Sequence, residues 1–222
     1  MPYPGKLITL EGLDGCGKST QLELEARRLR SSGFRVTTTH EPGGTPVGQQ
    51  MRDLVLHSPS QLTPLAELAL MFAARAQHVE QVVMPALQAG EIVLCDRFTD
   101  SSVAYQGYGR GIPVEQIRTL EELFCQGVRP DLTLILDLDP ETGLDRALAR
   151  NRSGVLATSR FEKEELEFFR RVREGYREIA RREPERVQMV DATGSIADIE
   201  QCVRQRVDEF LKRVHFGPSY GL

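Results

Sequence analysis

Short apolar runs alternate along the chain with longer segments in which apolar residues recur every three or four positions. Five of these runs are rich in Leu, Ile and Val, and we predict that they form buried strands. They span residues 7–10, 35–39, 92–95, 132–136 and 187–190. Because helical patterns separate them, the sequence predicts an α/β fold with a five-stranded parallel sheet and helices on both faces.

Capping residues indicate where several helices begin and end. The helix after the first strand is expected to stop at Gly33, in the left-handed conformation that glycine adopts readily. Thr63 followed by Pro64 is typical of a helix start, and Ser195 with Asp198 predicts a capping box for the last helix. A proline at position 85 is expected to kink or divide the helical region after Pro64.

The composition is that of an ordinary globular protein. The 222 residues are 40% hydrophobic and 27% charged, which excludes disorder, collagen and a coiled coil for the chain as a whole. The predicted elements account for nearly all of the length, so we expect a single domain over residues 1–222. The 28 basic and 32 acidic residues give a net charge of −4, which argues against a nucleic-acid polymer as a partner.

Neither a membrane span nor a secretion signal is indicated. The sequence has no apolar run of about 18 residues, and its start lacks a basic segment followed by an apolar one. We therefore predict no membrane partner and a cytoplasmic location. The four cysteines are widely spaced, which favours free thiols over a disulfide framework or a zinc site.

The strongest motif lies between the first predicted strand and the helix that follows it. Residues 12–19, GLDGCGKS, match the phosphate-binding pattern GxxxxGK[ST] and are called the phosphate loop below. Its glycines let backbone N–H groups turn toward phosphate oxygens, Lys18 can neutralise the β and γ phosphates, and Ser19 can ligate magnesium. The predicted ATP-binding residues are Gly12, Leu13, Asp14, Gly15, Cys16, Gly17, Lys18, Ser19 and Thr20.

A phosphate loop alone does not decide the class of protein. The sequence lacks the Asn-Lys-x-Asp of GTPases and the Ser-Gly-Gly signature of ABC-type ATPases, so a small kinase is the leading interpretation. A non-catalytic ATP-binding subunit or switch is the alternative from another class. Asp14 places a carboxylate inside the loop, where it can hydrogen-bond a sugar hydroxyl or hold magnesium through water.

Three further segments, with the phosphate loop, resemble the thymidylate kinases, which phosphorylate dTMP with ATP. They are EPGGT at 41–45, DRF at 96–98 and AYQG at 104–107, and the resemblance covers roughly residues 5–205. It implies the P-loop NTPase fold, ATP and Mg²⁺ as cofactors, dTMP as substrate and a homodimer. Another nucleotide kinase of this fold, acting on dUMP, dCMP or a deoxynucleoside, is the nearest rival.

The resemblance also assigns the groups around the transferred phosphate. It places Arg97, a planar fork suited to phosphate, on the acceptor's phosphate, and Asp96 with Ser19 on the magnesium side. By spacing alone, Asp137 and Asp139 at the end of the fourth strand fit the magnesium role equally well, and the resemblance favours Asp96.

The base pocket follows from helical spacing. Because residues 71, 72 and 75 lie at i, i+1 and i+4, Phe72 or Met71 can flank a base while Arg75 reaches its edge. The family generally has Phe at position 71, so the assignment of stacking to Phe72 is one position off the pattern. The resemblance adds Glu41, Ser101, Ser102, Tyr105 and Gln106 as substrate contacts, with Tyr105 crowding the sugar C2′.

A basic stretch at 146–162 resembles the family's lid. The phosphate loop carries no arginine, so the lid is expected to supply one, and we predict Arg150 and Arg152 as catalytic residues with Arg160 next. Two positions depart from the family pattern: His40 replaces an Arg and Ser159 replaces an Asp. The loop at 191–194 is the predicted adenine contact by resemblance.

Overall fold

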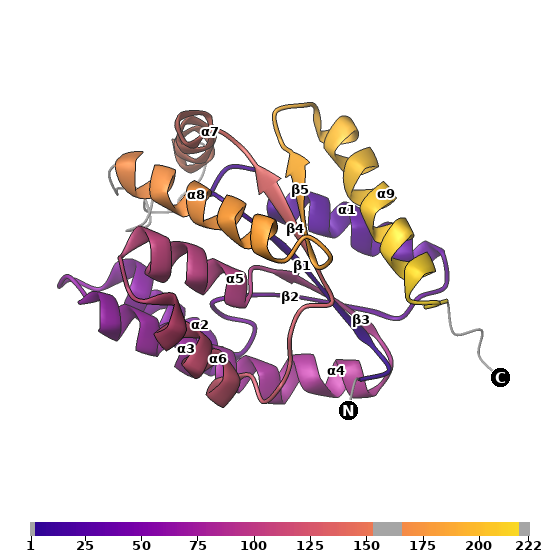
Figure 1. Cartoon of the computed structure of the whole chain (residues 1–222), viewed down its shortest axis with the longest axis horizontal. Helices are drawn as coiled ribbons and strands as arrows, with labels where there is room; N and C mark the ends of the chain where they lie inside the picture. Colours follow the sequence, from indigo (N-terminus) through magenta and orange to yellow (C-terminus); the bar gives the residue numbers. More distant parts are fainter. Residues whose placement is uncertain (1–2, 153–165, 218–222) are drawn as a thin grey trace.

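The computed structural model describes residues 3–152 and 166–217, with the backbone alone at 147–152. Its described strands form one parallel sheet in the order β2-β3-β1-β4-β5 (Figure 1). They are β1 (Lys6–Gly12), β2 (Val36–His40), β3 (Ile92–Asp96), β4 (Leu132–Asp137) and β5 (Val187–Asp191). The predicted α/β fold and all five strands are confirmed.

Every strand runs one or two residues past its predicted carboxyl end, into polar positions. In β1 and β3, for example, Leu10 pairs with Asp96, and Gly12 of β1 pairs with Leu136 of β4. The sequence pattern ends where the side chains become polar, whereas the ladder continues because the neighbouring strands still supply partners. The loops that contribute to the candidate site begin directly after the last residues of β1, β2 and β3.

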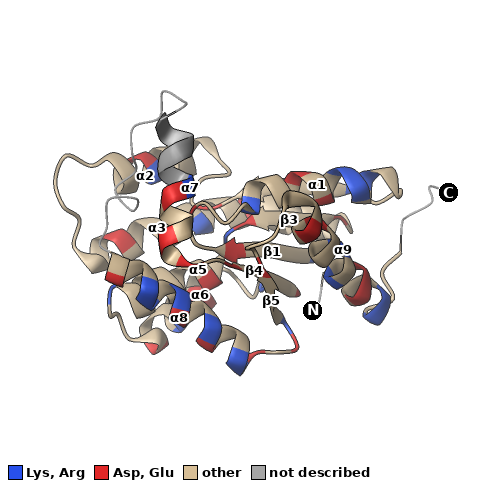
Figure 2. Ribbon diagram, turned by 90° about the horizontal axis from the view of Figure 1, so that it is seen from above, with Lys and Arg blue, Asp and Glu red and all other residues tan. Residues whose placement is uncertain are grey.

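Helices cover both faces of the sheet (Figures 1 and 2). On one face, α1 (Lys18–Ser31) and α9 (Ile196–Arg213) enclose the first of the buried apolar clusters. The remaining described helices are α2 (Pro46–His57), α3 (Pro64–His78), η1 (Val79–Val83), α4 (Met84–Gln88), α5 (Thr99–Ser102), η2 (Val103–Gly109), α6 (Val114–Phe124), α7 (Pro140–Arg152) and α8 (Leu166–Arg182). Of these helices, α8 and those from α3 to α6 pack over the opposite face of the sheet.

The predicted caps are confirmed. Thr63 accepts a hydrogen bond from the N–H of Ala66, and Ser195 and Asp198 form the reciprocal capping box. Gly33 has a φ of 86° directly after α1. The helical region around Pro85 is not divided. Instead, the π-helical turn η1 precedes this proline, which lacks the N–H of a regular helix.

The topology brings separate loops to one edge of the sheet. The phosphate loop follows β1, Glu41 follows β2 and Arg97 follows β3, and the carboxyl ends of parallel strands share an edge. In open α/β sheets, ligands bind at this edge, near the point where the strand order reverses. Within the described ranges, no helix has the length and apolar character needed to cross a membrane.

Candidate functional site

The phosphate loop has the geometry of an anion cradle. Gly12, Gly15 and Gly17 have φ values of 133°, 80° and 97°, a region that other residues adopt only with strain. At Gly12, an added Cβ would lie 2.5 Å from the carbonyl oxygen of Leu136, so no side chain fits there. The loop leads directly into α1, whose N-terminal N–H groups favour negative charge.

Lys18 is buried against the loop that it is predicted to serve. Its Nζ donates hydrogen bonds to the carbonyl oxygens of Leu13, at 2.8 Å, and Gly12, at 3.2 Å. This places the ammonium group inside the cradle, where a bound phosphate chain would be its strongest available partner.

Ser19 and Asp96 lie close together. The Ser19 hydroxyl donates a 2.7 Å hydrogen bond to Oδ2 of Asp96 across the gap between α1 and β3. A hydroxyl oxygen beside a carboxylate is the kind of oxygen donor set that suits Mg²⁺, so these two residues fit the predicted metal role. The alternative carboxylates are engaged elsewhere: Asp137 accepts from Arg173 at 2.6 Å, and Asp139 caps α7.

A cavity opens beside the phosphate loop. Three arginines, an acid from the phosphate loop and several polar side chains of the segment after β3 line its wall. The lining residues are Asp14, Glu41, Pro42, Arg52, Leu56, Met71, Arg75, Arg97, Phe98, Ser101, Ser102, Tyr105 and Gln106. With the exception of Phe72, every residue predicted to contact the acceptor lies on this cavity.

Arg97 occupies the side of the cavity nearest the phosphate loop. Its backbone has a φ of 70°, unusual for a residue with a side chain. The guanidinium donates to Asp14 at 2.7 Å and to the hydroxyls of Ser101, Tyr105 and Tyr176 at 3.2 Å each. Although burial disfavours its charge, Tyr105 and Asp14 hold the pKa of Arg97 well above its usual value, so the group stays cationic.

Arg75 lies on another part of the wall, in a buried polar cluster. It donates to Oε2 of Glu41 at 2.6 Å and to the hydroxyl of Ser102 at 3.0 Å. The other oxygen of Glu41 bonds Nδ1 of His78, whose Nε2 lies 2.6 Å from the hydroxyl of Thr39. Despite burial, Arg75 and His78 lower the pKa of Glu41, so this acid is ionised and fixes the arginine at the cavity.

The two neighbours on α3 differ in what they face. Met71 is partly exposed and lines the cavity, whereas Phe72 is fully buried in the core, with its ring centroid 6.0 Å from that of Phe124. Of the two stacking candidates, Met71 lines the cavity and Phe72 does not. The Phe72 ring packs against Phe124 and lies under the guanidinium of Arg75, 4.7 Å from its central carbon, so its predicted stacking on the base stays a prediction.

Two predicted polar contacts are already engaged inside the protein. Ser101 donates to Glu11 at 2.6 Å, and Gln106 donates its side-chain amide to Glu67 at 2.9 Å.

Burial, followed by Arg52, lowers the pKa of His40, so this position does not carry the full charge of the family's Arg at neutral pH.

The sequence analysis missed three residues of this region. Arg52 comes from α2, a helix that we did not predict, and its Nη1 donates to the carbonyl oxygen of Pro42 at 2.9 Å. Glu11, in β1, accepts a hydrogen bond from the N–H of Phe98, the residue after Arg97. Tyr176, in α8, donates its hydroxyl to Glu11. The start of α2 does carry a signal in the sequence: Thr45 and Pro46 form the same helix start as Thr63 and Pro64, and Thr45 accepts the N–H of Gly48 at 3.0 Å. No local pattern marks the other two residues.

Several predicted residues fall outside the described part of the chain. The lid at 146–162 is described only to position 152, and the side chains of Arg150 and Arg152 are not described. Arg160 and Ser159 also lie outside the described residues. The predicted adenine loop does follow β5, where the N–H of Thr193 donates to Asp191 at 2.9 Å.

Comparison with known proteins gives concordant matches. The sequence profile described as Thymidylate kinase matches residues 10–203. A thymidylate kinase of Citrifermentans bemidjiense is 49% identical over 218 residues, covering 94% of this chain and 95% of the relative. One from Synechococcus sp. (strain JA-3-3Ab) is 52% identical over 192 residues, covering 86% and 90%. The crystal structure of thymidylate kinase from Ehrlichia chaffeensis superposes with a TM-score of 0.72 at 33% identity, covering 91% of this chain and 98% of that one.

Proposed function

The chain belongs to the thymidylate kinase family, and we propose that the cavity beside its phosphate loop is the dTMP site. The protein phosphorylates dTMP with ATP to give dTDP, a step in dTTP synthesis. One observation carries the assignment of the site. Lys18, which is buried, and Arg97, which is largely buried, belong to adjacent loops, one in the phosphate loop and one on the wall of the cavity.

Arg97 binds the phosphate of dTMP in this proposal. Its Nη2 leaves or shares Asp14, since a phosphate with two charges competes well against one carboxylate. The phosphoryl group of ATP, held by the loop and by Lys18, then lies opposite the acceptor oxygen for in-line transfer. That oxygen is anionic or nearly so, and positioning and charge neutralisation dominate over general-base work.

The base lies at the other end of the cavity. Arg75, fixed by Glu41 and Ser102, presents its guanidinium to the edge of thymine, and Met71 packs against the ring. Tyr105 lies under Arg97, with the guanidinium carbon 5.0 Å from the ring centroid, and crowds the sugar. A bulky wall at C2′ selects deoxyribose because a ribose hydroxyl would clash with it.

Ser19 and Asp96 would hold magnesium in this scheme, because their side-chain oxygens are suited to that ion. When bound, the ion neutralises charge on the β and γ phosphates. The arginines of the lid, Arg150 and Arg152, are proposed to take the same charge-neutralising role, because the phosphate loop has no arginine of its own.

We further propose a single-domain chain that acts in the cytoplasm as a homodimer. Support for the dimer comes from exposed leucines on helices that pack together: Leu54 on α2, Leu65 on α3 and Leu123 on α6. A second copy would cover this apolar surface. Sedimentation of the wild type and of Leu123→Asp tests it, with a dimer that weakens in the variant as the expected result.

A nucleotide panel separates this function from its rivals. ADP release by purified protein is measured with dTMP, dUMP, dCMP and thymidine as acceptors. The thymine methyl contributes about 1–3 kcal/mol in an apolar pocket, so dUMP should be a slower substrate than dTMP. Faster turnover of dCMP or thymidine would favour another kinase, and ADP release that no acceptor stimulates would favour an ATP-binding switch.

A further inference from the structure

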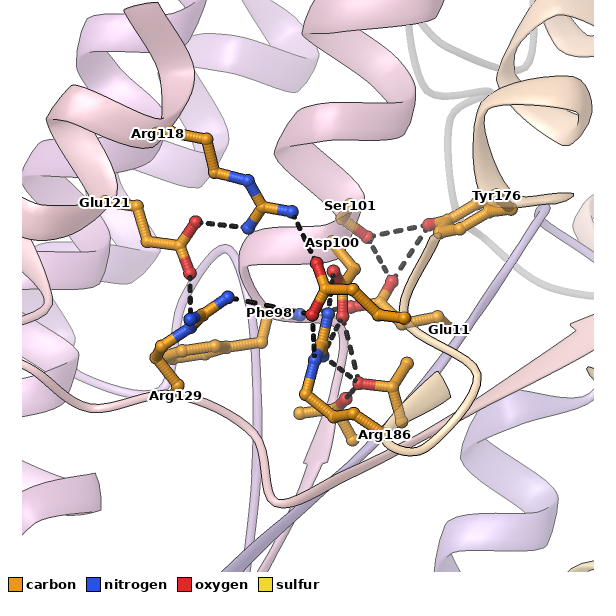
Figure 3. A network of polar contacts seen from close by, with 12 residues as sticks. Glu11, Phe98, Asp100, Ser101, Arg118, Glu121, Arg129, Tyr176 and Arg186 are labelled. Carbon is orange, nitrogen blue, oxygen red and sulfur yellow. Dashed lines mark hydrogen bonds and ion pairs between the residues drawn. The ribbon is translucent and has the colours of Figure 1, made fainter. Parts of the chain in front are cut away.

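The mechanism leaves one buried carboxylate beside the acceptor site without a role. Glu11, in β1, has no exposed surface and lies on the face of the sheet that α5 and α8 cover. Its Oε1 accepts the N–H of Phe98 at 2.7 Å, and its Oε2 accepts the hydroxyls of Ser101 at 2.6 Å and Tyr176 at 2.9 Å (Figure 3). Three donors thus converge on a single acid from two different segments.

Both hydroxyls also accept a hydrogen bond from Arg97. Its Nη1 lies 3.2 Å from the Ser101 hydroxyl and 3.2 Å from that of Tyr176. A hydroxyl has one proton, and an ionised carboxylate can only accept. The two hydroxyl oxygens also lie 2.9 Å from each other, so either proton could point to the other hydroxyl instead. The negative charge of Glu11 favours donation of both protons to the carboxylate, which leaves the hydroxyl lone pairs for the arginine.

We propose that Glu11, acting through Ser101 and Tyr176, is a positioning residue that holds the Arg97 guanidinium toward the phosphate of dTMP. This rests on the proposed function, in which Arg97 binds that phosphate. Nη1 is fixed from behind, so the rest of the guanidinium faces Asp14 and the cavity. The arrangement also explains how an arginine with a left-handed backbone keeps one orientation.

A second buried pair fixes the segment that carries these donors. Asp100, between Phe98 and Ser101, accepts two hydrogen bonds from Arg186, at 2.7 and 2.9 Å. Arg186 also donates to the hydroxyl of Thr133 in β4 at 2.8 Å. Glu183 joins this pair to Arg118 and Arg129, which both also bind Glu121, so the network in Figure 3 extends outward from Arg186. The segment after β3 is thereby attached to β4 and to the start of β5.

The surroundings of Glu11 make its charge dependent on pH. The charged groups that act on it are Asp100 and Arg97, both from the segment after β3, and Tyr176 faces it from α8. Burial and then Asp100 raise the pKa of Glu11 to about 7, against Arg97 and the hydrogen bonds from Ser101 and Phe98. Once protonated, Glu11 donates one of these bonds itself, and the negative charge that polarises the two hydroxyls accepting from Arg97 is lost.

The test is calorimetric binding of dTMP to wild type and Glu11→Gln, without ATP, at pH 8 and pH 6. Loss of a charge-assisted network is expected to weaken binding about tenfold at pH 8. At pH 6, with a pKa near 7, about nine-tenths of the wild type is itself protonated, so the ratio should fall to about twofold. A ratio that is the same at both pH values, or near one at both, overturns the proposal.

Tyr176→Phe is a second variant, because it removes one donor and leaves Glu11 in place. We expect binding about threefold to fivefold weaker at pH 8 and a pH dependence displaced to higher pH, since Glu11 loses a bond that favours its charged form. Tyr108→Phe, at a tyrosine that lines a different cavity, is the matched control and should bind dTMP as the wild type does. Equal effects of the two tyrosine variants would overturn the proposal.

Thymidine and Arg97→Ala separate this proposal from the function on which it rests. Thymidine has no phosphate, so Glu11→Gln should leave its binding within about twofold of wild type. If Arg97→Ala binds dTMP as tightly as the wild type, the assignment of the phosphate to Arg97 fails. If Arg97→Ala weakens dTMP but Glu11→Gln does not at pH 8, only the role of Glu11 fails.

Discussion

Nη2 of Arg97 donates a 2.7 Å hydrogen bond to Oδ1 of Asp14, joining the acceptor cavity to the phosphate loop. Asp14 is about one-third exposed, whereas Arg97 is largely buried. The arginine is therefore held cationic between the phosphate loop and the cavity proposed to bind dTMP. A phosphate that enters the cavity meets a preformed cation, which removes most of the cost of ordering that side chain on binding.

The phosphate loop yields the first prediction. Lys18→Ala should lower kcat/KM by about 100-fold or more, because the variant loses the ammonium group that neutralises the transferred phosphate. Initial rates with ATP and dTMP varied separately will measure this. Lys212→Ala, at an exposed lysine of α9, should retain wild-type rates. Unchanged turnover of Lys18→Ala would remove the loop from the reaction.

The Ser19–Asp96 contact predicts a metal dependence. Asp96→Asn should raise the Mg²⁺ concentration for half-maximal rate by about 10–100-fold, since it removes the negative oxygen of the pair. Magnesium titrations at fixed ATP and dTMP give the value. Asp139→Asn serves as the control, because Asp139 caps α7 in the structure. A stronger effect at Asp139 would restore the alternative that the sequence left open.

Adjacent residues on α3 are expected to give opposite phenotypes. Met71→Ala should raise KM for dTMP about tenfold with little loss of stability, because it removes an apolar wall of the cavity. Phe72→Ala should lower the free energy of unfolding by about 3–5 kcal/mol, because it leaves a hole in the core. Urea unfolding and dTMP kinetics on both variants distinguish the two; a KM effect confined to Phe72→Ala would contradict the placement.

Glu41 links acceptor binding to stability and pH. Glu41→Gln should destabilise the protein by about 3 kcal/mol at pH 7, because Arg75 and His78 lose their buried anion. The pKa of Glu41 is lowered on folding, so this stabilisation is complete above the unfolded value of about 4.5 and is lost as the pH falls through the folded pKa.

Denaturant unfolding between pH 3 and pH 7 measures the difference between wild type and Glu41→Gln. It should be constant from pH 5 upward and shrink below pH 4. The exposed Glu122→Gln is the control and should differ from wild type by less than about 0.5 kcal/mol throughout. A difference for Glu41→Gln that grows on acidification would have the wrong sign for an ionised, paired acid.

Features with a local cause were predictable from the sequence. The five strands follow from continuous apolar runs, and the phosphate loop follows from the spacing of its glycines before Lys18 and Ser19. The carboxyl ends of parallel strands share one edge of the sheet, so the loops after β1, β2 and β3 were expected to lie together. Each of these inferences needs only neighbouring residues and one rule of topology.

Features that depend on distant contacts were not predictable. Tyr176 reaches Glu11 across 165 positions, and no pattern near either residue indicates the pair. Met71 and Phe72 are adjacent on α3, so helical spacing could not decide between them, and packing against Phe124 did. Arg52 was missed for a different reason, because α2 was not identified although Thr45 and Pro46 mark its start locally.

The central claim is that Arg97 presents the phosphate of dTMP to ATP held by the phosphate loop. A single-turnover experiment with γ-labelled ATP tests it most directly, comparing the wild type with Arg97→Ala in the presence of dTMP. We predict that the label appears in dTDP with the wild type and that Arg97→Ala forms dTDP at least about 100-fold more slowly. Equal rates of dTDP formation by the two proteins, or release of the label as inorganic phosphate alone, would contradict the account.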